Sequence, residues 1–180
     1  MISLPQRQPL LSIGDLPLSP CDGEWLQARI EEAAQAAGRG DFWLARDIAC
    51  GIMLYLEKDF VGTVIALPNL LERVRMLLEK LDCADVAAHL DSSPPPMHFW
   101  LPQIAEEAGN GFELAFFSSL RARLEACTAH GVREVRLSGL RPCVQHLRGA
   151  AKWRKDCESL ATEILYFIRQ HHLAPSVEVP

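Results

Sequence analysis

The feature of this sequence that most constrains its fold is a run of apolar residues at helical spacing between residues 42 and 90. Two long segments carry this run, because apolar side chains recur in them every three or four residues, as in a helix that buries one face. The first segment contributes Leu44, Ile48, Ile52 and Leu56, and the second contributes Leu70, Leu71, Val74, Leu77, Leu78 and Leu81. Because two such faces bury each other, the pattern predicts a helical amino-terminal half built around this pair.

Local signals place further elements beside the pair. Asp22 is expected to cap a helix over residues 23–37, and Pro68 suits the first turn of the second paired helix. We expect Asp82 to cap a short helix over residues 84–90. Three consecutive prolines then favour a stiff extended conformation, which predicts a domain over 1–91, a linker over 92–96 and a second domain over 97–180.

The carboxy-terminal half is predicted to combine a small sheet with helices. The apolar patterns predict extended segments over 97–101 and 132–137, and helices over 112–130, 142–148 and 153–172. We expect a loosely ordered tail over 174–180, and we find no internal repeat in the sequence. The fold class that follows is α+β, mainly α, with a small sheet packed by helices in the second half.

Composition narrows the class of protein. The chain has 180 residues, 49% of them hydrophobic, which is enough to bury a core. Residues 1–18 fit no secretory signal and no segment has eighteen uninterrupted apolar residues, so we expect a cytoplasmic protein with no membrane partner. The six cysteines are scattered without a Cys-x-x-Cys pair, which predicts reduced, buried thiols.

The net charge of -5 hides a basic region. Between Arg121 and Lys155 the chain has nine Lys or Arg against two Glu, a local excess of seven positive charges. This segregation suggests a polyanion-binding face, or alternatively solvated basic helices that neutralise the acidic half. Trp153 is able to stack a base, although its spacing to Cys157 and Leu160 also fits a core position. The candidate polyanion-binding residues are Arg133, Arg136, Arg141, Arg148, Lys152, Arg154 and Lys155.

One spacing in the chain fits a metal site. Cys127-x-x-His130 is followed after twelve residues by Cys143-x-x-His146, and two Cys with two His form a tetrahedral zinc set. The alternative is that Cys127 continues an apolar helical row and that Cys143 is a core thiol, and we prefer this interpretation, with no bound metal. We find no nucleophile motif and no phosphate-binding loop, so we assign no catalytic residue and favour a non-enzymatic role.

The amino-terminal half also resembles a known family. Its segments Glu-Trp-Leu-Gln-Ala-Arg-Ile-Glu-Glu-Ala-Ala (24–34), Ala-Arg-Asp-Ile-Ala (45–49), Leu-Leu-Glu-Arg-Val-Arg-Met-Leu-Leu (70–78) and Cys-Ala-Asp-Val-Ala (83–87) are similar to the helical order of the ATP-cone. That family is a small regulatory domain of ribonucleotide reductases and their repressor, and the resemblance implies ATP or dATP as a ligand. The family grips phosphate with adjacent Lys and Arg in an amino-terminal hairpin. Residues 4–9 here read Leu-Pro-Gln-Arg-Gln-Pro, with Arg7 as the one cation, so we transfer no binding residue.

These observations predict a regulatory or binding protein. It would have a nucleotide-sensing domain, in degenerate form, and a basic face for nucleic acid or an acidic protein partner. The alternative is a structural homo-oligomeric module with no small-molecule ligand. Residues 111–117, Tyr166 and Phe167 favour it, because they are more apolar than one helix face requires.

Overall fold

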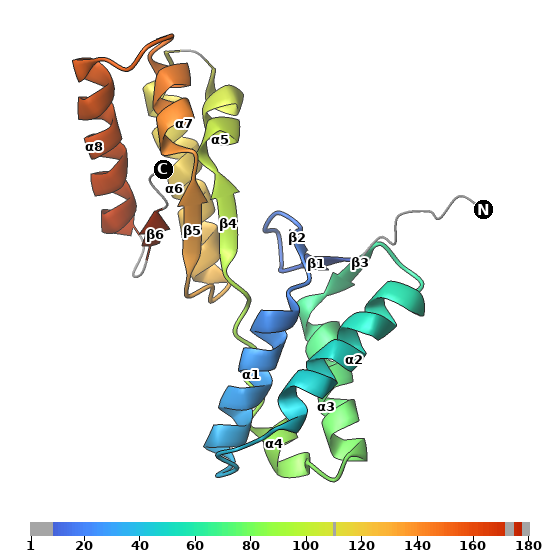
Figure 1. Cartoon of the computed structure of the whole chain (residues 1–180). Coiled ribbons are helices and arrows are strands. Elements are labelled where there is room, and N and C mark those ends of the chain that lie inside the picture. Colours follow the sequence, from blue (N-terminus) through green and yellow to red (C-terminus); the bar gives the residue numbers. More distant parts are fainter. Residues whose placement is uncertain (1–8, 110, 172–174, 178–180) are drawn as a thin grey trace. The chain divides into compact units, whose positions relative to one another are not determined.

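A computed structural model describes residues 9–109, 111–171 and 175–177 and divides the chain into two compact units, Met1–Ser93 and Pro94–Pro180 (Figure 1). The division falls within the predicted linker, residues 92–96. Both units combine helices with a three-stranded sheet, and helices predominate. The predicted fold class, α+β and mainly α, is therefore confirmed.

The amino-terminal unit begins with its sheet. The strands are β1 (Leu10–Ser12), β2 (Ser19–Pro20) and β3 (Val64–Ala66), in the order β2-β1-β3. β1 runs antiparallel to β2 and parallel to β3, and Leu11 pairs with Ile65. These two side chains are buried, whereas Leu10 and Val64 beside them are exposed. One face of the sheet therefore belongs to the core and the other faces outward.

Four helices among the described residues complete this unit. They are α1 (Gly23–Ala36), α2 (Leu44–Lys58), α3 (Leu67–Lys80) and α4 (Ala84–Ala88). Asp22 caps α1 as predicted, because its side chain accepts a hydrogen bond from the Glu24 N–H at 2.8 Å. Pro68 lies in the first turn of α3, also as predicted. The apolar rows of the two predicted helices are buried, at Ile48, Ile52, Leu56, Leu70, Leu71, Val74 and Leu78. The two helices contact each other little, however, because α2 packs mainly against α1 and α3 mainly against α4.

Two residues of this unit differ from the sequence prediction. Leu81 follows the last turn of α3 and is 44% exposed, so it does not extend the buried row. The prediction that Asp82 caps α4 is wrong, because the N-cap is Cys83 and no side chain caps that helix. Asp82 instead has a φ of +55°, a left-handed conformation that Asp tolerates and that reverses the chain after α3.

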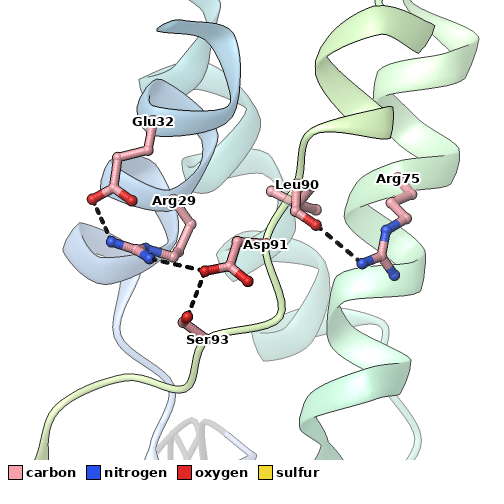
Figure 2. Close-up of polar contacts among 6 residues, drawn as sticks. All are labelled: Arg29, Glu32, Arg75, Leu90, Asp91 and Ser93. Carbon is pink, nitrogen blue, oxygen red and sulfur yellow. Dashed lines mark hydrogen bonds and ion pairs between the residues drawn. The ribbon is translucent and has the colours of Figure 1, made fainter. Parts of the chain in front are cut away.

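Arginine contacts hold the end of this unit in place (Figure 2). Arg29 of α1 forms ion pairs with Glu32 and, at 3.8 Å, with Asp91, and the Ser93 hydroxyl donates to Asp91. Arg75 of α3 donates a hydrogen bond to the Leu90 carbonyl at 3.2 Å. Residues 90–93 are therefore fixed against α1 and α3 before the prolines begin.

The carboxy-terminal unit contains a parallel sheet. Its strands β4 (Met97–Trp100), β5 (Val135–Ser138) and β6 (Pro175–Val177) lie in the order β4-β5-β6. The connecting helices are α5 (Leu101–Ala108), α6 (Glu113–Ala129), α7 (Leu140–Leu147) and α8 (Lys155–His171). The prediction of a loose tail is wrong over 175–177, because this segment pairs with β5, a non-local contact that leaves no periodic signal. Residues 174 and 178–180 of that predicted tail lie outside the described residues.

One order of elements recurs along the described chain. A strand followed by two helices occurs four times, beginning at β1, β3, β4 and β5, with β2 inserted in the first copy. Leu-Pro opens the first helix of two copies, at Leu67-Pro68 and Leu101-Pro102. Sequence comparison within the chain misses this order because the second helix varies from 5 residues in α4 to 17 in α6. Among the helices of the described residues, none combines the length and apolar character needed to span a bilayer.

Candidate functional site: an open sheet face

Strand alternation gives the carboxy-terminal sheet two unlike faces. Met97 and Phe99 of β4 are buried, as are Val135 and Leu137 of β5. The helix α6 lies on this side, behind β4 and β5 in Figure 1, and its Arg123 guanidinium is 5.9 Å from the centre of the Phe99 ring. The alternate residues His98, Trp100 and Arg136 are exposed on the opposite side. The second face therefore presents polar and aromatic side chains to solvent.

A hydrogen bond between the strands fixes one of these side chains. The parallel register places His98 beside Arg136 and Trp100 beside Ser138. His98 Nε2 lies 2.7 Å from Ser138 Oγ, a diagonal contact between the strands. Ser138 is 8% exposed, so the hydroxyl is a rigid partner and we assign the contact a positioning role. The imidazole is thereby held on the open face next to Arg136.

Trp100 lies at the carboxyl end of the same face. Its side chain is 49% exposed, and its six-membered ring lies against the backbone of Gly139. A Cβ at Gly139 would come within 2.7 Å of both Trp100 Cζ3 and Pro102 Cδ, and the φ of Gly139 is +77°. Glycine therefore suits this position, where the chain turns from β5 into α7 and the indole closes over the turn.

One of the predicted polyanion-binding residues, Arg136, belongs to this face, and a second, Arg133, precedes its strand. Arg136 is on β5, its side chain is 55% exposed, and its Nε donates to Glu134 at 2.8 Å. Arg133 is exposed just before the strand. The cationic group of this face is therefore partly neutralised by a carboxylate, which weakens its electrostatic attraction for an anion.

The other five predicted residues lie on α7, on its connection to α8 and at the first residue of α8. Arg148 pairs with Glu113 and Arg154 pairs with Asp156, each at 3.0 Å, while Lys152 and Lys155 are exposed. Arg141 is in the first turn of α7, and its guanidinium is 5.4 Å from the centre of the Trp153 ring. The structure therefore separates the predicted cluster into a strand group and a helix group. Trp153 is partly exposed beside Arg141 and is not a core residue.

The four residues of the candidate zinc set do not come together. Cys127 and Cys143 are fully buried, and burial raises the pKa of the two thiols to about 11 and about 12. Thiols that retain their proton at neutral pH are poor metal ligands. Across 9–109, 111–171 and 175–177, no three His, Cys, Asp or Glu side chains are grouped so that they could hold a metal ion.

The sequence prediction did not identify the open face. The signal was the alternation in Met-His-Phe-Trp of β4 and Val-Arg-Leu-Ser of β5, which places polar and apolar side chains on opposite faces. The pairing of the two strands, which unites His98 with Ser138, has no local signal. The segment compared with the phosphate-binding hairpin of the ATP-cone, residues 4–9, lies outside the described residues except for Pro9.

Comparison with known proteins identifies no relative: no protein-family model, no curated protein and no solved structure matches this chain. The functional argument therefore depends on the side chains of the open face.

Proposed function

We propose that this chain is a binding protein whose open β4–β5 face contacts single-stranded nucleic acid. The observation that supports this most is the exposed group of His98, Trp100 and Arg136 on adjacent strands of a parallel sheet. Parallel sheets in folded proteins usually have both faces covered. A parallel sheet face that bears exposed aromatic and cationic groups therefore suits a ligand.

The spacing of the rings suits successive bases. His98 and Trp100 are two residues apart on β4, which corresponds to about 6.6 Å along a strand. Stacking of a base on an aromatic side chain contributes about 1–3 kcal/mol and tolerates any sequence. Arg136, which lies beside His98 in the register of the two strands, would pair with a phosphate of the same nucleic-acid strand, and Arg133 and Arg141 are further candidates for phosphate contacts. A duplex hides its base faces, so a single strand is the expected ligand.

The direct test is fluorescence anisotropy of a labelled single strand of about 10 nucleotides, within the site sizes that single-strand binding folds cover. The full chain should bind at low ionic strength and more weakly as salt rises. Trp100→Ala should weaken binding about tenfold, since one stacked base is lost. The matched control is Phe112→Ala, which removes another exposed aromatic ring, 64% exposed, outside the face.

Three outcomes would contradict this function: no binding at low salt, equal binding of a duplex, or equal losses of affinity in the two variants.

For the amino-terminal unit, the resemblance to the ATP-cone makes ATP or dATP the ligand to test. Binding to the native state would raise the melting temperature.

A homo-oligomeric role is the second proposal. The observation in its favour is apolar exposure in the carboxy-terminal unit, where Leu114 is 86% exposed and Tyr166 is 65% exposed. Apolar side chains at this exposure often lie in contacts between copies. Light scattering over a range of protein concentrations tests it, and a constant monomer mass would exclude it.

A further inference from the structure

A second surface lies in the amino-terminal unit, between the start of α1 and the length of α2. It is a groove of about 840 Å³. The α2 residues that line it are Arg46, Ala49, Cys50, Met53, Leu54 and Glu57. Their spacing of three and four residues is one continuous helix face, and at 1.5 Å per residue it extends for about 16 Å.

Apolar side chains lie along the middle of this groove. Ala49 is buried, Met53 is half-buried and Leu54 is 50% exposed. An exposed leucine beside a methionine in a groove provides apolar surface for the anchors of a partner.

The acidic and basic side chains that line the groove lie towards opposite ends of it. A Cβ at Gly23 would lie 3.3 Å from Met53 Cγ, so the beginning of α1 adjoins the last turns of α2. Glu24 and Glu57, which both line the groove, therefore lie towards the same end, together with the capping residue Asp22. Arg46 lines it about three turns away along α2. The unit as a whole is acidic, with fourteen Asp or Glu against eight Lys or Arg over residues 1–93.

We propose that this groove binds an amphipathic helix of a partner protein, with apolar anchors against Met53 and Leu54 and Lys or Arg at the end formed by Glu24 and Glu57. Helices that bind in grooves place anchors at i, i+3, i+4 and i+7, and α2 presents apolar surface over a matching length. Complementary charge fixes the direction of the bound helix and excludes acidic helices. The site lies in the other unit from the open sheet face, so this proposal does not rest on the proposed nucleic-acid binding.

Cys50 provides the means to test the proposal on the full chain. It lines the groove and is the exposed one of the six cysteines, so a maleimide fluorophore will report from this position. The probes are two synthetic amphipathic helices with Leu at the same anchor positions, one with Lys and one with Glu at its polar positions. The Lys peptide should change the fluorescence saturably, and the Glu peptide should bind at least tenfold more weakly. Calorimetry with the unlabelled chain checks that the fluorophore does not create the site.

Variants locate the binding. Glu24→Gln combined with Glu57→Gln should weaken the Lys peptide at least fivefold and reduce the salt dependence of its affinity. The matched control is Glu72→Gln combined with Glu79→Gln, two exposed carboxylates of α3 outside the groove, which should leave the affinity unchanged. Leu54→Glu should weaken both peptides, and thermal unfolding of each variant confirms that it is folded.

Each of the other outcomes overturns the proposal. Equal affinity for the two peptides, or equal effects of the groove variant and the α3 variant, would mean that binding is non-specific. Protection of Cys50 from maleimide that increases with protein concentration would show that a second copy occupies the groove. Protection that is independent of concentration and is removed by salt would show that the chain covers the groove itself.

Discussion

Two features of the structure favour glycine at position 139, a positive φ and a close contact with neighbouring side chains. Their contributions to the free energy of unfolding can be measured separately. Both Gly139 and Gly131 have positive φ, +77° and +74°, but only at Gly139 would a Cβ meet Trp100 and Pro102. Gly131→Ala should cost about 1–2 kcal/mol of unfolding free energy for the backbone conformation alone. Gly139→Ala should cost about 1–3 kcal/mol more, because overpacking is added to that strain. Urea unfolding measures both, and equal losses would show that the indole moves aside.

The buried thiols predict a loss of stability at alkaline pH. Burial raises the pKa of Cys143 to about 12 in the native state, above the value of about 8.5 in an unfolded chain. Above about pH 8.5 the thiol ionises in the unfolded chain but keeps its proton in the native state. The free energy of unfolding therefore falls as pH rises above about 8.5, by about 1.4 kcal/mol per pH unit for each such thiol. Unfolding free energies from pH 8 upward should fall less steeply in Cys143→Ala than in the wild type, by about that amount per pH unit. Cys50→Ala, which removes an exposed thiol, should leave the slope unchanged.

Single residues could be predicted where their signal is local. Asp22 caps α1 because a short acidic side chain before an apolar helical row reaches the first free N–H groups. The same argument failed at Asp82, whose left-handed backbone places it before the cap. His98 and Ser138 are forty residues apart, and their contact depends on strand register, which no local pattern encodes.

At the scale of elements, the contacts of Arg29 determine how the chain leaves the amino-terminal unit (Figure 2). Asp91 is 49% exposed, so its ion pair with Arg29 should contribute about 0.2–1 kcal/mol. Asp91→Asn should therefore change global stability little but should speed amide hydrogen exchange in residues 90–93, since the segment opens locally. The control is Glu72→Gln, which removes an exposed i,i+3 pair within α3. Unchanged exchange in Asp91→Asn would show that the Arg75 contact is sufficient.

Long helices were predictable because their apolar rows repeat over several turns, as in α2, α3, α6 and α8. Among the short elements, α4 was predicted over 84–90 and ends at Ala88, whereas β6 was missed, because its three residues are too few for a period to develop. The open face was missed for a related reason. Four residues in each of β4 and β5 show the alternation, but only their pairing shows that the polar residues form one surface.

At the scale of the whole molecule, two separate cores predict two independently folding units. The first core includes Leu26 and Val74, and the second includes Phe116 and Ile164, all fully buried. Fragments 1–93 and 94–180 should therefore each unfold cooperatively in urea, although units of this size are only marginally stable. Circular dichroism measures both transitions, and the two spectra should sum to that of the full chain. A fragment without a transition would contradict this independence.

The position of β6 at the end of the parallel sheet has a consequence during synthesis. β4 and β5 are complete once Ser138 has been made, but the partner of the free edge of β5 begins at Pro175. At about 5–20 residues per second, the intervening residues take about 2–7 s to translate. For that interval the nascent chain has an unpaired strand edge, which other chains could join. Ribosomes that stall or terminate before residue 175 should therefore release a product that aggregates. Pairing of β6 with β5 removes this exposed edge and so prevents association with other chains.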